Sequence, residues 1–529
     1  MKRVAIAFLI VTSLYAGAKK PTQWGVNGHL NAYIKNDNIV GGGDSNLRER
    51  KGLTHNEELN LNVAGPLKDG EAGINVRGRT TNDNRIQKDG AELLYFRGYY
   101  KDKAWNVEGG DVAASYNSYI FSSSLKGAKV VYKSLKKERT FNYSAIAGVK
   151  KASWKELYSN GRNETPTGYG GAFEIKYIHQ RAKEIALSFA TYNDDIHSGG
   201  IDSNVTGKRG YGAGLDGKWR FNKYVTLKGR GAVTTGTDNK RDHKADTTAN
   251  AIQLRLYTRP ILRSVKSNFI YQRVESDFIS FGGTAAADKE QLENMTSWRV
   301  NKEFNIRVDL KANRNNLDGK QTNGTTNSIY EALTCTYRPA SLRRTTLTLR
   351  GTNKDIDNNA KDDNRKTARL DMTTRLKSGW RYGGGYEYSN YKDKKDVNSA
   401  RRTNTLHALV GYKQKLSKVR SYRFTCRANL RNLRQSSGRQ DTVGVKIDAG
   451  YIHNKRISAD LAYMLNSTDN EVNNDINNNT YQFRAAYKLD DMGQNIVRLL
   501  LEKRDVEVDN TPNSSYDEYI EKLSLVMKF

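Results

Sequence analysis

The most regular feature of this chain is the alternation of apolar and polar residues in segments of about ten residues, which recur from Trp24 onward. In the segment 304–312, one face carries Phe304, Ile306, Val308, Leu310 and Ala312, and the other carries Asn305, Arg307, Asp309 and Lys311. The segments 368–376, 422–431 and 481–489 repeat this pattern. Residues two apart share one face of a strand, whereas the apolar stripe of a helix recurs every three or four residues. The pattern therefore predicts β-strands along the whole chain.

The number of alternating segments indicates a very large sheet. Counting them predicts about 26 strands, within a range of 22–28, and about 20 residues for each strand with its connection. The polar faces are charged rather than merely polar, and turn residues (Asn, Asp, Gly, Lys and Ser) separate the segments. We therefore expect an all-β protein that forms a single large transmembrane antiparallel β-barrel without a plug domain.

Composition supports this class of fold. Hydrophobic residues make up 37% of the 529 residues, charged residues 27%, and the mean hydropathy is −0.78. Disordered chains are poor in aromatic residues, whereas this chain has 31 Tyr. No stretch after residue 20 has the run of about 20 apolar residues that a spanning helix needs. A membrane barrel accounts for these values, because only every second residue of its strands faces lipid.

Soluble all-β folds are the competing class, among them sandwich arrays, propellers and β-helices. No sequence repeat of 20–50 residues, the mark of propellers and solenoids, is visible. Apolar faces end in aromatic residues, as expected where strands cross a membrane interface. These are Tyr33, Tyr132, Tyr177, Trp380, Tyr388, Tyr412 and Tyr451.

The N-terminal residues have the three parts of a secretory signal peptide. Lys2 and Arg3 are basic, residues 4–14 are apolar, and Ala16-Gly17-Ala18 fits a cleavage site. We expect residues 1–18 to be the signal peptide and residues 19–529 to be the barrel. Cleavage would lower the formal charge from +30 to +28, since Lys2 and Arg3 are lost.

The last strand resembles the C-terminal strand of bacterial outer-membrane proteins, which is read by their assembly machinery. Its alternating residues and terminal aromatic are Tyr519, Leu523, Leu525, Met527 and Phe529. Together with the signal peptide, this resemblance implies a multi-pass barrel in the bacterial outer membrane, in contact with lipid and lipopolysaccharide.

Five longer connections are candidate outer loops: 36–56, 151–167, 193–209, 276–293 and 392–403. Within the fourth of these, residues 278–283 and 285–294 could hold a short helix that folds into the lumen. Such a segment would narrow the pore.

The residues that usually carry enzyme or metal chemistry are sparse. Cys335 and Cys426 both fall on apolar, lipid-facing positions about five strands and roughly 24 Å apart, so they cannot form a disulfide. The seven His show no metal-ligand spacing, and no C-x-x-C-H haem motif or G-x-S-x-G motif occurs. We expect no enzyme activity, no catalytic or metal site, no cofactor and no bound nucleic acid.

Basic residues dominate the polar faces of the predicted strands. The main inward cations are Arg255, Arg299, Arg307, Lys311, Arg350, Arg369, Arg375, Arg423, Arg427 and Arg484. Acids on the same faces are fewer: Glu174, Asp216, Asp309, Asp371, Glu387, Asp448 and Asp460. These cations are candidate contacts for a partner or for anions. Alternatively, much of the positive charge lies in loops that face anionic lipopolysaccharide.

The expected width of the barrel raises the question of what fills it. About 26 strands tilted near 40° enclose roughly 50 Å, far more than a 16–18-stranded porin. This architecture resembles the porin component of porin–cytochrome conduits, the MtrB/PioB-like barrels. MtrB-like members often carry an N-terminal C-x-x-C that is missing here, so the chain is more similar to the Geobacter type. The resemblance implies a barrel that sheathes a multihaem c-type cytochrome for transmembrane electron transfer.

Three functions remain open at this stage. The first is the cytochrome sheath, a structural and interaction role. The second is a diffusion channel or transporter for anionic solutes, with inward-folded loops that constrict the pore. The third is a secretion barrel that passes a polymer or polypeptide.

Overall fold

Each alternating segment forms a strand, because period-two alternation gives a strand one face for lipid and one for water. The computed structural model describes residues 24–529 except 42–51, 84–85, 87–89, 135–138, 152–153, 155–166, 181, 196–205, 241–243, 260–263, 282–285, 321–323, 343, 418, 455, 472–473, 491–493 and 510–513. The predicted signal peptide, residues 1–18, lies outside the described residues. The prediction of about 26 strands is confirmed, since the described chain contains 26.

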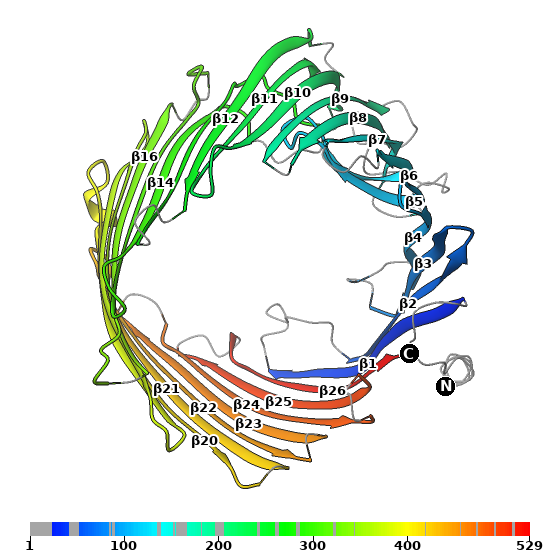
Figure 1. Cartoon of the computed structure of the whole chain (residues 1–529). Coiled ribbons are helices and arrows are strands. Elements are labelled where there is room, and N and C mark those ends of the chain that lie inside the picture. Colours follow the sequence, from blue (N-terminus) through cyan, green and yellow to red (C-terminus); the bar gives the residue numbers. More distant parts are fainter. Residues whose placement is uncertain are drawn as a thin grey trace.

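The strands follow one another around the ring in chain order (Figure 1). They are β1 (Gly25–Gly41), β2 (Gly52–Leu67), β3 (Gly70–Thr81), β4 (Ala91–Lys101), β5 (Trp105–Ser115), β6 (Ser122–Lys133), β7 (Arg139–Lys150), β8 (Thr167–His179), β9 (Lys183–Asp195), β10 (Arg209–Arg220), β11 (Val225–Thr237), β12 (Thr247–Thr258), β13 (Val265–Val274), β14 (Lys289–Arg299), β15 (Phe304–Asn315), β16 (Thr326–Tyr337), β17 (Thr345–Asp357), β18 (Asp362–Arg375), β19 (Trp380–Asp393), β20 (Arg401–Lys415), β21 (Arg420–Gln435), β22 (Gly438–His453), β23 (Ile457–Asn470), β24 (Ile476–Lys488), β25 (Ile496–Val508) and β26 (Tyr516–Lys528). A short 3₁₀ helix, η2 (Val397–Ser399), lies between β19 and β20.

The sheet closes on itself between its first and last strands. β1 and β26 are antiparallel, and their register runs from His29, opposite Lys528, to Gly41, opposite Tyr516. Beyond the register, the Gly28 N–H donates to the Phe529 carbonyl at 2.7 Å and the Phe529 N–H donates to the Gly28 carbonyl at 3.0 Å. Closure removes the free edges that an open sheet of this size would expose. The all-β, closed antiparallel barrel predicted from the sequence is therefore confirmed.

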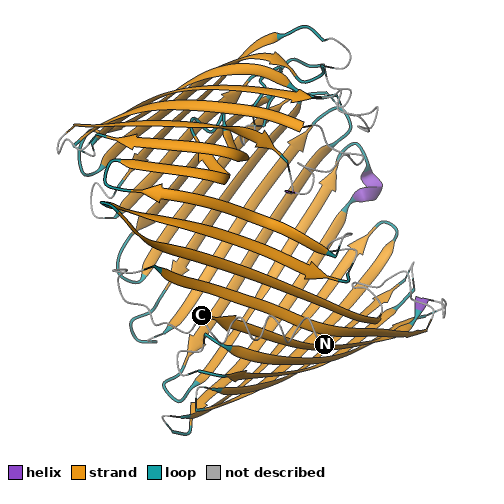
Figure 2. Ribbon diagram, turned by 90° about the vertical axis from the view of Figure 1, so that its right-hand side faces the viewer, coloured by secondary structure: helices purple, strands orange, loops and turns teal. Residues whose placement is uncertain are grey.

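The two ends of the barrel differ in their connections. Connections after even-numbered strands are mostly short, such as 68–69 after β2 and 102–104 after β4. Connections after odd-numbered strands are mostly longer, such as 151–166 after β7. We call these the short-connection end and the long-connection end. All five predicted outer loops fall at the long-connection end, although β1 and β2 extend into the range 36–56 and shorten that loop. Figure 2 shows the strands tilted between these two ends.

Aromatic side chains gather on the outer face near the short-connection end. Ring centroids are 4.8 Å apart for Trp105 and Tyr132, and 4.6 Å apart for Trp380 and Tyr412. Such a belt is typical of strands that cross a membrane interface. Tyr33 is an exception among the predicted belt residues, because the Lys522 ammonium lies 3.9 Å from its ring centroid on the inner face. Its neighbours Ala32 and Ile34 hold the outward positions, so alternation turns Tyr33 inward.

Candidate functional site

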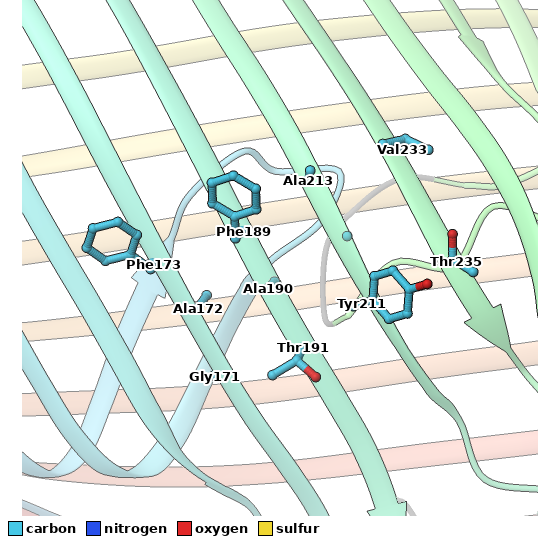
Figure 3. Close-up of a pocket in the computed structure, with 11 residues that line it drawn as sticks. Gly171, Ala172, Phe173, Phe189, Ala190, Thr191, Tyr211, Ala213, Val233 and Thr235 are labelled. Carbon is cyan, nitrogen blue, oxygen red and sulfur yellow. The ribbon is translucent and has the colours of Figure 1, made fainter.

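The inner and outer faces of the wall can be assigned on β10. A Cβ atom built at Gly212 lies 3.1 Å from Ile120 Cγ2, and one at Gly214 lies 2.6 Å from the Asn117 amide nitrogen, so even-numbered positions face a segment inside the barrel. Odd-numbered positions such as Tyr211 and Leu215 are exposed on the outer face. Figure 3 shows Phe173, Phe189, Tyr211 and Val233 on this outer side, with the pale blue segment on the far side of the sheet. Strand register extends the assignment to every neighbouring strand.

The predicted inward cations all occupy inward positions by this register. They lie on strands β12, β14, β15, β17, β18, β21 and β24. These strands span the wall from the side opposite the seam between β1 and β26 to two strands before β26. Arg255 on β12 donates to the Asn268 amide oxygen at 2.6 Å, and Arg350 on β17 donates to the Tyr330 hydroxyl at 2.8 Å.

Several of these cations form ion pairs within the wall. Arg307 pairs with Asp309 at 2.8 Å, and Lys311 pairs with Glu293 at 2.7 Å. Arg369 bridges Asp371 at 2.7 Å and Glu387 at 3.3 Å. These side chains nevertheless stay open to the lumen, since 44% of Arg369 and 51% of Arg307 is exposed. The ion pairs therefore orient the cations without covering them.

Other cations have no acidic partner. In the part of the chain that the structure describes, the side chains of Arg299, Arg375, Arg427 and Arg484 form no ion pair or hydrogen bond. Between β18 and β21 the inward cations are Arg365, Arg369, Arg375, Arg381, Arg401, Lys413, Lys415, Arg423, Arg427 and Arg431. The inward acids of the same strands are Asp363, Asp371, Glu387 and Asp393. This part of the wall, which we call the cationic arc, has a clear excess of positive charge.

A hairpin inside the lumen is the feature that the sequence did not reveal. Beyond Gly110 and Gly127, the ends of β5 and β6 leave the wall, and residues 111–125 fold inward as what we call the inner hairpin. Gly110 adopts a φ of +102°, which disfavours other residues. A Cβ at Gly127 would lie 2.0 Å from the Ala147 carbonyl oxygen, so the bend needs glycine there as well.

The inner hairpin packs against small inward residues of β7–β12. Its tip contains Tyr116, Tyr119, Ile120 and Phe121, all of them buried. The wall beneath it carries Ile146, Ala172, Ala190, Ala232, Ala249 and Ala251 in addition to Gly212 and Gly214. Large side chains at these positions would fill the space that the hairpin occupies. We call this region of wall the covered arc.

Polar contacts hold the hairpin tip in register. The Asn117 amide donates to the Gly231 carbonyl at 2.9 Å, and the Arg230 guanidinium donates to the Ser118 hydroxyl at 2.5 Å. Arg230 also pairs with Asp216 at 2.6 Å. These bonds satisfy polar groups that packing against the wall removes from water.

A second connection enters the lumen beside the hairpin. Residues 275–281, which we call the inner loop, follow β13, and Phe281 forms a parallel bridge with Phe121. Phe278 packs edge-on to Tyr119 at 6.2 Å. The predicted inward fold of this connection is thus confirmed, but the predicted helix is wrong. Residues 278–280 have no regular secondary structure and Phe281 forms the bridge. Residues 289–294 already belong to β14, because paired strands satisfy their backbone groups in the wall.

The inner hairpin could have been suspected from two signals. The connection after β5 reads Tyr116-Asn117-Ser118-Tyr119-Ile120-Phe121, which is too apolar for a loop exposed to water. Gly and Ala replace charged residues on the inward faces of the strands that receive it. The prediction that no plug domain is present stays a prediction, since residues 1–23 lie outside the described chain.

Below the inner hairpin lies a mixed-charge recess of about 400 Å³. In this recess, Glu184 forms ion pairs with Lys176, at 3.1 Å, and with Lys218. The ion pair between Arg230 and Asp216 lines the same recess. Glu174, Glu184 and Asp216 offset three of the five cations that line this recess, so its excess of positive charge is smaller than that of the cationic arc.

The residues of the predicted assembly signal lie along the closing strand. Leu523, Leu525 and Met527 pair with the outward residues Ile34, Ala32 and Leu30 of β1, so they share the outer face. Tyr519 is also outward and 38% exposed. A Cβ built at Gly28 lies 2.7 Å from the Phe529 ring, which shows that this ring packs directly on β1.

No group of three or more His, Cys, Asp or Glu that could hold a metal occurs among the described residues. Within those residues, no helix has the length and apolar character needed to cross a membrane. Cys335 and Cys426 are free, as predicted, and both point outward.

Comparison with solved structures shows that the chain is similar to other β-barrels in its fold. The sequence matches no protein-family model and no curated protein. The siderophore receptor PirA from Acinetobacter baumannii aligns with 97% of this chain and 81% of its own, at 10% identity and a TM-score of 0.44. The translocation pore of the P pilus usher PapC covers 96% of this chain and 100% of its own, at 11% identity and a TM-score of 0.37. OpdK from Pseudomonas aeruginosa covers 61% and 94%, at 11% identity and a TM-score of 0.30. Similarity this low does not bear on the function.

Proposed function

We propose that this protein is an outer-membrane β-barrel whose lumen sheathes a folded acidic partner, a multihaem c-type cytochrome, for transmembrane electron transfer. The observation that carries the proposal is the cationic arc, an open stretch of positively charged wall in a very wide barrel. The chain itself would hold no cofactor and perform no catalytic step. Its role would be to exclude lipid from the partner and to hold it across the membrane.

The outer face supports an outer-membrane location. Exposed Leu, Ile, Phe and Tyr residues cover it, including Leu310, Leu333 and Leu370, and the aromatic belt borders it at the short-connection end. The assembly-signal residues lie on the same face. Export through a cleaved signal peptide fits this location and is part of the proposal.

The width of the lumen supports an occupant. A ring of 26 strands spans roughly 50 Å at a typical tilt, and the described inward segments cover only the arc from β7 to β13. A gap of that size would defeat the sieving role of an outer membrane. A folded partner protein of suitable diameter would close it.

The chemistry of the cationic arc supports an acidic partner. Arg423 is 58% exposed although it pairs with Asp460 at 2.8 Å, so its remaining donors point into the lumen. Multihaem cytochromes carry two propionate groups on each haem, which makes a multihaem surface suited to arginine donors. Charge complementarity of this kind sets orientation and specificity more than raw affinity.

Extraction of the native protein in mild detergent, followed by haem staining and identification of associated chains, tests the proposal. We expect a multihaem cytochrome in stoichiometric amount. The triple variant Arg369→Gln, Arg423→Gln and Arg427→Gln should retain severalfold less haem. The matched control Lys366→Gln, Arg402→Gln and Arg434→Gln removes the same charge from the outer face and should retain all of it. A colourless barrel from native membranes would overturn the proposal.

A diffusion channel for anionic solutes is the second candidate. The observation that favours it is the pair of inward segments, because the inner hairpin and the inner loop narrow the lumen without any partner. In this case the protein alone should conduct in planar bilayers with a selectivity for anions. The reversal potential in a salt gradient measures that selectivity.

A further inference from the structure

A recess lies on the inward wall where β18–β21 approach the long-connection end. Its volume is about 370 Å³, within the size range of pockets that bind small ligands. Four cations line it: Lys361 from the connection before β18, Arg365 from β18, Arg401 from β20 and Arg431 from β21. We call this feature the rim recess.

Strand register brings these cations together. Arg365 lies opposite Tyr391 on β19, and Tyr391 lies opposite Arg401 on β20. The two arginines are therefore separated by two strand spacings, or about 10 Å, with one tyrosine between them. Arg431 lies opposite Thr405, four residues along β20 from Arg401, and lines the same recess.

The floor of the recess is polar and buried. Asp363 and Ser389 are only 8% and 6% exposed. The Tyr391 hydroxyl donates to the Asp363 carboxylate at 2.6 Å, and Arg365 Nε donates to the Ser389 hydroxyl at 3.3 Å. The Arg401 guanidinium lies 5.7 Å from the centroid of the Tyr391 ring. These contacts position Arg365 and Arg401, and within the described residues no hydrogen bond or ion pair occupies their terminal nitrogens.

The charge of the rim recess is not balanced by its surroundings. Asp363 is its one lining carboxylate within the described chain. The neighbouring Asp393 accepts from the backbone N–H groups of Lys395 and Asp362. Asp362 is engaged by Lys394 at 3.0 Å, and this hydrogen bond raises the pKa of Lys394 above its ordinary value. Four cations therefore face Asp363 and the adjacent Asp393, and the remaining excess of positive charge favours a multiply charged anion.

We propose that the rim recess is a binding site for phosphate groups, which Arg401 and Arg431 contact with paired N–H donors and Lys361 with its ammonium. Guanidinium groups match tetrahedral phosphate oxygens in this way. The site does not depend on whether the lumen holds a cytochrome or passes solutes. Two sources present the same chemistry at this end of the barrel: a free polyphosphate, and the phosphorylated sugars of lipopolysaccharide.

Calorimetric titration of the purified full-length barrel with inorganic pyrophosphate tests the site. The wild type should bind saturably, and the double variant Arg401→Gln and Arg431→Gln should bind about tenfold more weakly or worse, since it loses two charged donors. The control Arg402→Gln and Arg434→Gln removes the same charge from outward positions of β20 and β21, which lie outside the recess. Its dissociation constant should change by less than about threefold. Absence of binding to the wild type, or an equal loss in both variants, would overturn the proposal.

Two further experiments identify the chemical class and the source of the ligand. Citrate carries a similar charge on planar carboxylates, so equal or tighter binding of citrate would overturn the assignment to phosphate. Phosphorus analysis of the barrel extracted with its lipopolysaccharide separates the two sources. If pyrophosphate releases lipopolysaccharide from the wild type, and the double variant does not retain lipopolysaccharide, the ligand is the phosphorylated sugar of lipopolysaccharide. Pyrophosphate binding without such release would identify a free anion.

Discussion

The covered arc and the cationic arc are two stretches of one wall with opposite inward chemistry. On β10, inward Gly212 and Gly214 leave room for the inner hairpin, whereas on β21 three of the inward positions are held by Arg423, Arg427 and Arg431. Small inward residues leave space in which the inner hairpin packs against the wall. Long cations keep a segment away and present charge to whatever enters. The comparison shows that the barrel supplies its own filling on one side and leaves the other side free.

The largest expected effect concerns the hydrophobic attachment of the hairpin. Phe121 is fully buried between the wall and Phe281. The Phe121→Ala variant should weaken the attachment of the hairpin by about 3–5 kcal/mol, because it leaves a cavity in a packed cluster. Limited proteolysis within residues 111–125 and bilayer conductance should both increase. The control Phe141→Ala removes a lipid-facing ring and should leave both unchanged, and equal behaviour of the two variants would contradict the assigned packing.

A smaller effect separates the two faces of the cationic arc. Leu370 faces lipid and Thr373 faces the lumen on the same strand, β18. Leu370→Arg should cost about 2–4 kcal/mol of folding free energy if it lies near the bilayer midplane. Thr373→Arg should cost less than about 0.5 kcal/mol, since water reaches it. Urea unfolding in lipid vesicles measures both, and similar costs would show that the face assignment is wrong.

The smallest effect distinguishes the arginines of the two arcs. Arg230 donates to both Asp216 and Ser118, so it connects the covered arc to the hairpin. Arg230→Gln should destabilise this connection by about 1.5 kcal/mol, at the low end for charged hydrogen bonds because the side chain is partly exposed. Arg427→Gln should change stability by less than about 0.5 kcal/mol but shift ion selectivity towards cations. If Arg427→Gln also loosened the hairpin, the two arcs would not be independent.

The regular part of the wall could be predicted from the sequence, because alternation is a local signal. The alternating residues Ile306, Val308 and Leu310 predict both the strand and the face of it that contacts lipid. The same rule puts Arg307 and Lys311 on the inner face, where the register has them. What alternation cannot give is contact between strands far apart in the chain. Asn117 meets Gly231, and Phe121 meets Phe281, because the inner hairpin and the inner loop leave the wall and enter the lumen.

The sequence did not reveal the rim recess, and the helix prediction for the loop was wrong, for the same reason. The rim recess needs Arg365, Arg401 and Arg431 to converge from three strands, and no single segment shows this. The helix expected within residues 278–294 was judged from local composition alone. In the structure, Phe278 packs with Tyr119 and Val274, while Ile279 and Phe281 pack in the cluster around Phe121, so tertiary packing determines the conformation of this segment.

The pairing of β1 with β26 also has a consequence for assembly. Every other pair of neighbouring strands is close in sequence. The second hydrogen-bonding edge of β1, in contrast, stays unpaired until β26, the last strand, has been synthesised and can pair with it. Contacts between residues so distant in sequence form slowly, and an unpaired edge invites pairing with other chains in the meantime. We therefore expect the closing step to be the slowest step in the folding of this barrel. A protein that temporarily pairs with β1 or β26 would act as its folding catalyst.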